Sequence, residues 1–222
     1  EKEMLAWLAQ DPATKVIAFY VEGFGPGQGR EFVAAADACP KPIVIMKSGK
    51  TSAGNRAVSS HTASLAGDYA SFAAAMAQHN IIEAADEREL VSFCEALSAY
   101  ERGIGRNIGI ITGSGGHGAM AADACVVAGL STPALSGELQ AQIKSALSES
   151  IRSIASLANP ADLTGSGVDE DFVACAKAMG ASAEIDCVLV LLLPYLPGIT
   201  LDIGVKLSSV SRQFKKPFIA YV

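Results

Sequence analysis

The apolar residues of this chain fall into short continuous runs that are separated by segments with helical spacing. Runs of strand length cover residues 16–21, 43–46, 81–82, 108–112, 187–193 and 217–222. Segments with helical spacing cover residues 1–10, 30–39, 68–79, 87–100, 119–128, 136–148, 169–179 and 201–214. A strand that is apolar at every position is covered on both faces, as in a parallel sheet. Strands that alternate with helices therefore predict an α/β fold with mostly parallel sheets between layers of helices.

Polar residues mark the expected starts of several helices. Asp86 and Glu89 have the spacing of a capping box, in which each side chain accepts a backbone N–H of the first turn. Ser136 and Asp169 stand directly before apolar periodic segments, where Ser and Asp are favoured as N-caps. We therefore expect these residues to begin three of the helices.

The alternation is interrupted at residues 102–106, Arg-Gly-Ile-Gly-Arg, and then restarts in the same style. We therefore expect two tandem domains, residues 1–102 and residues 106–222. Half of the residues are hydrophobic, which is enough to form a core in each. The chain begins with Glu1 rather than Met and its last residues belong to an expected strand, so we expect a piece of a longer polypeptide.

Residues 47–67 have the clearest chemical character. They follow the second expected strand, are rich in Ser, Thr, Gly and Ala, and contain His61 near their far end. A loop of about twenty residues without periodicity is uncommon in a compact domain and is usually functional or disordered. Glu22 follows the first expected strand. Because parallel strands end at one ligand-binding edge, we expect Glu22 and a loop that delivers His61 to meet there.

A neutral imidazole attacks phosphorus well when a carboxylate holds one of its nitrogens protonated. Glu22 has the position for this role and His61 would then be the nucleophile that carries a phosphoryl group. The alternative is a solvated acid beside a loop histidine without a task, and position alone does not decide between the two. Lys47 and Lys50 flank the loop and could attract phosphate, although exposed lysines are common. His79 lies on an apolar helix face, so we expect it to be packed in the core.

A glycine-rich turn separates the first strand and helix of the second domain. It comprises Gly113, Ser114, Gly115, Gly116, His117 and Gly118. Backbone N–H groups and the helix dipole bind phosphate at such positions. A dinucleotide site would also need an acidic residue about twenty residues further on, to bind the ribose. Glu138 lies at that distance, but it opens an expected helix and is not a convincing ribose partner. We therefore favour phosphate over a dinucleotide as the ligand of this turn. The alternative is a tight turn that binds nothing, with His117 simply exposed at the helix start.

Composition narrows the possible functions. The formal net charge is −6 and no basic stripe is present, so nucleic acid is not an expected partner. The five cysteines are scattered without C-x-x-C spacing, which predicts neither a disulfide framework nor a zinc site. No apolar run reaches the roughly 18 residues of a membrane span, and no signal peptide opens the chain. We expect a cytoplasmic protein without membrane contact or a metal site.

Two motifs resemble the NDP-forming acyl-CoA ligases, the family of succinyl-CoA synthetase and the ADP-forming acetyl-CoA synthetases. They are Lys-Ser-Gly-Lys at 47–50 and Ser-His-Thr-Ala-Ser-Leu-Ala-Gly at 60–67. The resemblance places the family's phosphohistidine on His61, its strand-end glutamate on Glu22 and its phosphate-binding glycine turn on residues 113–118. Asn-Pro-Ala-Asp at 159–162 is similar to a further family segment. Ala63, Ser114 and His117 depart from the usual residues of the family.

The resemblance implies two tandem flavodoxin-like three-layer domains of the succinyl-CoA synthetase type, the first lacking its N-terminal part. It implies a relay in which acyl-CoA, ADP and phosphate give a carboxylic acid, CoA and ATP through an acyl phosphate and phosphate carried on His61. CoA, ADP or ATP and Mg would bind mainly to absent CoA-binding and ATP-grasp domains, in the same chain or another subunit, and we expect an oligomer. The rival hypotheses are a ligand-sensing module, as in relatives fused to an acetyltransferase, and a flavodoxin-like protein with an incidental histidine.

Overall fold

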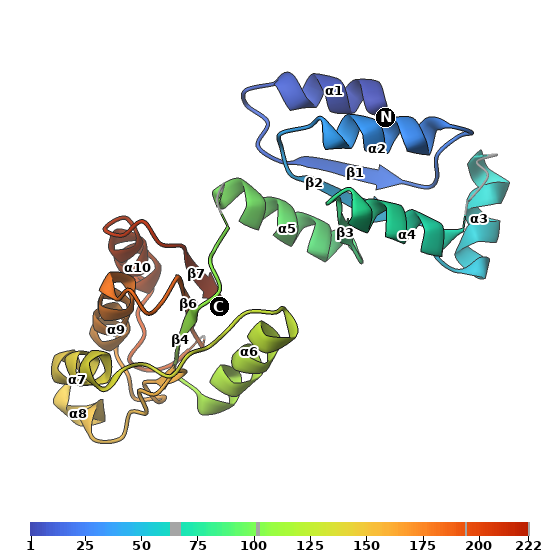
Figure 1. The fold of residues 1–222 in the computed structure, drawn as a ribbon. Coiled ribbons are helices and arrows are strands. Elements are labelled where there is room, and N and C mark those ends of the chain that lie inside the picture. The colour runs from blue at the N-terminus through green and yellow to red at the C-terminus, as the bar shows by residue number, and fades with distance from the viewer. Residues whose placement is uncertain (63–67, 101–102, 194, 222) are drawn as a thin grey trace. The chain divides into compact units, whose positions relative to one another are not determined.

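The computed structural model describes residues 1–62, 68–100, 103–193 and 195–221, and only the backbone for residues 59–62. The chain divides into two compact units, Glu1–Glu101 and Arg102–Val222. Each unit is described by itself. In both, helices alternate with strands along the chain (Figure 1).

The first unit contains a parallel sheet in the order β1-β2-β3, formed by Ile17–Val21, Ile43–Lys47 and Ile82–Ala84. Its helices are α1 (Lys2–Gln10), α2 (Gln28–Asp37), α3 (Ser52–Thr62), α4 (Tyr69–Gln78) and α5 (Glu87–Ala99). Leu5, Phe32, Ile45 and Met76 form part of a core between the sheet and helices α1, α2 and α4. Helix α5 packs against all three strands. The continuous apolar runs of the sequence thus become buried parallel strands.

The second unit contains a four-stranded parallel sheet in the order β5-β4-β6-β7. These strands are Ala161–Asp162, Ile108–Thr112, Cys187–Leu191 and Phe218–Tyr221. Helix α6 (Gly115–Val127) covers one face, while α7 (Gly137–Ala146), α8 (Glu149–Arg152), α9 (Asp169–Ala181) and α10 (Ile203–Ser211) lie on the other (Figure 1). The predicted α/β architecture with helices around mostly parallel sheets is confirmed.

The sequence prediction was wrong about residues 52–62, which were expected to be loop. They form helix α3. The backbone N–H of Gly54 donates to Thr51 Oγ1 at 3.1 Å, the contact by which a threonine caps a helix start. Val58 is buried, and its side chain would lie 3.2 Å from a Cβ at Gly49. The cap and the burial of Val58 stabilise a helix that small and polar residues made hard to recognise in the sequence.

Three further boundaries differ from the prediction. Helix α6 begins at Gly115, four residues earlier than expected, so most of the glycine turn lies in its first turn. A short strand, β5, occupies part of the loop expected at 159–165. Helix α9 has Val168 as its N-cap, whereas Asp169 was expected there. The carboxylate of Asp171 accepts the Val168 N–H at 3.0 Å, and this contact replaces a cap by Asp169.

Candidate functional site

The carboxyl ends of β1 and β2 lie side by side in the first unit. The strands pair with Val21 opposite Lys47, so Glu22 and Ser48 are the first residues beyond the sheet. The N–H of Ser48 donates to the Val21 carbonyl at 3.1 Å. Glu22 therefore emerges next to the segment that leads into α3 and on to His61.

The side chain of Lys47 joins these two strand ends. Its Nζ donates to the main-chain oxygen of Glu22 and to that of Ser48, each at 2.7 Å. The residue is only 4% exposed, and its ammonium lies 5.6 Å from the centre of the Phe72 ring. Lys47 is therefore not one of the common exposed lysines, because its side chain turns back to the main chain at the ends of β1 and β2. Burial lowers the pKa of the Lys47 ammonium, while the carboxylates of Glu83 and Glu22 oppose that effect.

The carboxylate of Glu22 has one nearby hydroxyl. Tyr20 Oη lies 3.4 Å from Glu22 Oε1 and 3.1 Å from Ser48 Oγ. The longer of these contacts is weak by hydrogen-bond geometry. Glu22 itself is half-buried. Its carboxylate therefore retains acceptor capacity at the strand edge.

The backbone of residue 61 lies in the last turn of α3, which ends at Thr62. The imidazole of His61 and residues 63–67 lie outside the described part of the chain. A contact between His61 and Glu22 accordingly stays a prediction.

Lys50 forms an ion pair with a neighbouring acid. Its Nζ lies 2.8 Å from Glu83 Oε1, and the hydroxyl of Tyr69 donates to the same oxygen at 3.0 Å. Burial and this hydrogen bond raise the pKa of the Tyr69 phenol. Lys50 thus contributes to a local network that joins the start of α4 to β3.

A cavity of about 420 Å³ opens beside Lys47. Its lining combines apolar side chains with polar ones, namely Phe24, Val33, Phe72, Ala75 and Met76 together with Arg30, Asp68 and Ser71. Asp68 is the N-cap of α4 and accepts the Ser71 N–H at 2.8 Å. The cavity lies at the strand edge where open α/β sheets bind ligands.

In the second unit, the glycine turn meets an acidic side chain. A Cβ built on Gly115 would lie 2.9 Å from Asp162 Oδ2, which places the carboxylate against the first turn of α6. Asp162 Oδ1 accepts the Thr164 N–H at 2.9 Å. A carboxylate is stabilised at a helix N-terminus by the helix dipole. This helix end therefore has an anionic neighbour from its own chain.

The other members of the turn have local roles. Gly113 faces Leu196, and Gly118 packs tightly against Pro160 and Thr112. His117 is exposed, and its Nδ1 lies 3.1 Å from Ser114 Oγ. Gly116 has open space around it. The geometry gives Gly113 and Gly118 a packing reason to be glycine, while Gly116 has none.

Asn159 belongs to the segment whose sequence resembles a family motif. Its Nδ2 donates to the carbonyls of Ile108 and Pro133, and its Oδ1 accepts the Ile110 N–H, each at 2.9 Å. All hydrogen-bonding atoms of this amide thus have backbone partners. The residue fixes the position of β4, and with it the turn that comes after this strand.

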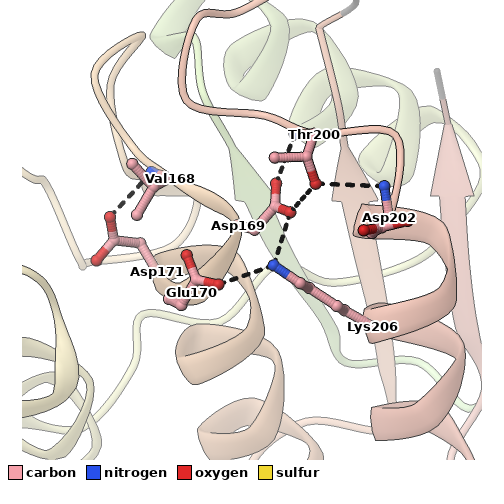
Figure 2. A network of polar contacts seen from close by, with 7 residues as sticks. All are labelled: Val168, Asp169, Glu170, Asp171, Thr200, Asp202 and Lys206. Atoms are coloured by element: carbon pink, nitrogen blue, oxygen red, sulfur yellow. Dashed lines mark hydrogen bonds and ion pairs between the residues drawn. The ribbon is translucent and has the colours of Figure 1, made fainter.

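A buried charged network at the start of α9 was missed by sequence reasoning. Asp169 is 1% exposed, accepts the Thr200 N–H at 2.9 Å and pairs with Lys206 Nζ at 2.9 Å (Figure 2). Lys206 also contacts Glu170 Oε1 at 2.8 Å. Burial acts to raise the pKa of Asp169, but the hydrogen bonds from Thr200 and Lys206 outweigh it and hold that pKa below its ordinary value. The network joins α9 to α10.

His79 differs from the prediction that it is packed in the core. Its Nδ1 lies 2.7 Å from Asp37 Oδ1, and its side chain is 24% exposed. It begins the segment after α4, where the imidazole reaches the end of α2. A carboxylate partner explains a polar residue on this otherwise apolar face.

Membrane spans and metal sites are both absent from the described residues. None of the helices there is long and apolar enough to cross a membrane. Within the same residues, no group of three or more His, Cys, Asp or Glu side chains is arranged to hold a metal ion.

Comparison with known proteins finds relatives of one kind, enzymes named as CoA ligases or synthetases. Residues 1–97 match the family model described as succinyl-CoA ligase like flavodoxin domain. The ADP-forming acetate–CoA ligase I of Archaeoglobus fulgidus is 37% identical over 194 residues, which are 87% of this chain and 27% of that protein. The alpha subunit of the ADP-forming acetate–CoA ligase I of Pyrococcus furiosus is 30% identical over 100% of this chain and 47% of that subunit.

A solved structure extends the similarity to both units. It is the dinucleotide forming acetyl-coenzyme A synthetase 1 of Ca. Korarchaeum cryptofilum in complex with phosphate and ADP. It superposes with a TM-score of 0.88 and 28% identity over 99% of this chain and 47% of that chain. The chain thus spans about half, or less, of the length of these relatives. The chain belongs to the NDP-forming acyl-CoA ligase family, and its fold is the flavodoxin-like α/β fold of the ADP-forming acetyl-CoA synthetases.

Proposed function

We propose that this chain is the phosphohistidine-bearing part of an NDP-forming acid–CoA ligase, which converts acyl-CoA, ADP and phosphate to a carboxylic acid, CoA and ATP. One observation carries the proposal. Glu22 and the segment that leads to His61 leave neighbouring parallel strands, with Ser48 N–H bound to the Val21 carbonyl at 3.1 Å. The names of the relatives, which are ADP-forming acetate–CoA ligases, support the same reaction class.

The proposed chemistry needs an imidazole in one tautomer. In the first step phosphate attacks the thioester carbon of acyl-CoA, and the CoA thiolate leaves. One nitrogen of His61 then attacks phosphorus, the bond from phosphorus to the acyl oxygen breaks, and the carboxylate leaves. The N–H of the other nitrogen donates to the Glu22 carboxylate, which stabilises the cation that forms.

In the last step an oxygen of ADP attacks the phosphorus on His61. The phosphorus–nitrogen bond breaks, ATP forms and the imidazole becomes neutral again. Phosphoryl transfer depends mainly on positioning and charge stabilisation. A segment that moves between two sites can supply this positioning. The segment that carries His61 would have this role.

The remaining substrates require further protein. The relatives are larger than this chain, so we propose that CoA binds a Rossmann-type domain and that ADP, with Mg, binds an ATP-grasp domain, on the same chain or another subunit. The assembled enzyme is proposed to be a cytoplasmic oligomer. In the second unit, residues 113–118 are proposed to face phosphate, with Asp162 limiting how tightly an anion binds there.

The test is incubation of the full-length enzyme, with its ATP-grasp part, with ATP labelled on the γ-phosphate. We expect an acid-labile, base-stable label that is absent after His61→Asn. Glu22→Gln should slow labelling about 100-fold, the lower range for loss of acid–base assistance. A protein that binds acyl-CoA but never acquires the label would be the ligand-sensing module instead. Glu22→Gln labelled at the wild-type rate would remove Glu22 from the mechanism.

A further inference from the structure

We infer that Lys47 is a positioning residue for Glu22, because its ammonium fixes the strand end from which the Glu22 carboxylate reaches His61. This inference rests on the proposed phosphohistidine function. It concerns a residue that does not itself touch the reacting phosphorus.

The Lys47 ammonium connects the two strand ends beyond the last sheet contact. Sheet hydrogen bonding between β1 and β2 ends with the contact from Ser48 N–H to the Val21 carbonyl. Beyond it, Lys47 Nζ donates to the carbonyls of Glu22 and Ser48, both at 2.7 Å. One ammonium thus continues the connection between the two segments by one residue past the sheet.

The burial of Lys47 is unfavourable for stability. The residue is 4% exposed, and no carboxylate among the described residues lies within ion-pair distance of its Nζ. A buried charge that lacks an ionic partner reduces stability relative to an apolar side chain of similar size. The Phe72 ring at 5.6 Å, the two carbonyls and the more distant carboxylates of Glu83 and Glu22 offset part of that loss. Packing alone would favour methionine at this position.

The backbone immediately after Glu22 has little intrinsic restraint. The next residues are Gly23, Phe24 and Gly25, and glycine restricts the backbone little. Without the Lys47 contact, the Glu22 carbonyl would lose its side-chain donor and the Glu22–Gly23 peptide would be free to rotate. Loss of this anchor would also free rotation about the N–Cα bond of Glu22, which swings its Cβ and carboxylate, so the ammonium controls the direction of that side chain.

The chain offers a matched control for this arrangement. Lys41 Nζ also donates to two main-chain carbonyls, those of Leu8 and Asp11. Lys41 precedes β2, so it lies at the opposite end of the parallel sheet from Glu22, which follows β1. Lys41→Met therefore removes the same kind of contact from the same unit without touching the candidate site.

The experiment measures the first-order rate at which His61 acquires label from γ-labelled ATP in the full-length enzyme, per folded molecule, by rapid quench. The variants are Lys47→Met, Lys41→Met, Glu22→Gln and the double variant Glu22→Gln/Lys47→Met. We expect Lys47→Met to slow labelling about 10- to 100-fold, as for loss of a residue that orients a functional group. Lys41→Met should lower the melting temperature but keep the rate within about twofold, since it lies outside the site.

The double variant separates positioning from a general structural role. If Lys47 acts through Glu22, the double variant is no slower than Glu22→Gln alone. Multiplied effects, or a Lys47→Met rate within about twofold of wild type, would overturn the inference. Should Lys47→Met fail to fold, Lys47→Gln, which keeps a neutral N–H₂ donor group but removes the charge, replaces it in the same cycle. Absence of any label on wild-type protein would instead refute the proposed function, so the two failures are distinguishable.

Discussion

The Asp162 carboxylate lies against Gly115, with Oδ2 2.9 Å from where a Cβ would stand. This places a negative charge beside the N-terminal turn of α6, the position that the sequence assigned to phosphate. A carboxylate and a phosphate at one helix end repel each other, although the helix dipole favours either anion alone. The relationship makes phosphate affinity at this turn depend on the charge of Asp162.

Asp162→Asn should therefore strengthen phosphate binding to the glycine turn. Removal of this negative charge near the helix end should make the free energy of phosphate binding more favourable by about 1 kcal/mol, which is about fivefold in affinity. The amide retains an oxygen that accepts the Thr164 N–H, so the loop keeps its contact. Titration with inorganic phosphate, followed by calorimetry, measures the effect.

Asp123→Asn is the control for charge alone, because Asp123 is an exposed residue of the same helix. It should leave the affinity unchanged. Equal affinities for wild type and Asp162→Asn would show that phosphate does not bind at this helix end.

Alanine substitutions at two glycines of the turn should have opposite effects on stability. Gly118→Ala forces a Cβ to 3.0 Å from both Pro160 Cβ and Thr112 Cγ2, whereas Gly116→Ala enters open space. We expect Gly118→Ala to lower the free energy of unfolding by about 1–2 kcal/mol, and Gly116→Ala to raise it by about 0.5–1 kcal/mol. Urea denaturation measures both, and a loss of stability in Gly116→Ala would contradict the placement of the turn.

Asp169→Asn should lower the free energy of unfolding of the second unit by an amount that depends on pH. The folded state holds the pKa of Asp169 below its ordinary value, so the ionised side chain stabilises the fold fully above about pH 5. That stabilisation is lost as pH falls through the folded pKa. Loss of charged hydrogen bonds should cost about 2 kcal/mol at pH 7. Urea denaturation between pH 7 and pH 3 should show the difference from wild type decreasing below about pH 4.

Asp202→Asn is the matched control, because Asp202 is an exposed acid beside the same network (Figure 2). It should shift stability by less than about 0.5 kcal/mol at every pH. A difference between Asp169→Asn and wild type that stays constant down to pH 3 would contradict the assigned charge state.

Asn159→Ala should destabilise the second unit more than most surface changes. The substitution leaves the Ile110 N–H and the carbonyls of Ile108 and Pro133 without their partner. Buried backbone groups without partners cost about 1–3 kcal/mol each before water compensates, so we expect a loss of about 3 kcal/mol. Thermal and urea unfolding measure it, with Gln142→Ala on the exposed face of α7 as control. A loss below about 1 kcal/mol would show that these groups find other partners.

Local signals in the sequence predicted several elements correctly. Asp86 Oδ1 accepts the Glu89 N–H at 2.9 Å, and Glu89 Oε2 accepts the Ala85 N–H at 2.8 Å, which resembles the expected capping box. Ser136 Oγ likewise accepts the Leu139 N–H at 3.2 Å. Such contacts join residues three or four apart, so the sequence pattern alone predicts them.

Helix α3 shows where local signals were too weak. Its residues are mostly small or polar and lack a hydrophobic stripe, and only the Thr51 cap marks its start. The sequence indicated the chemistry of the site only through residue types and motifs. The position of Glu22 after β1 followed from the alternation of strands and helices, while its contact with Lys47 did not.

The sequence by itself determined the order of strands and helices, the parallel arrangement and the candidates Glu22 and His61, because periodicity and strand-end position are properties of neighbouring residues. Only the tertiary structure decided which charges are buried and what faces them. Lys47 under the end of β1, Asp162 against Gly115 and Asp169 beside Lys206 each depend on a partner at least 25 residues away. Burial and electrostatic environment are set by such distant neighbours, and no local pattern encodes them.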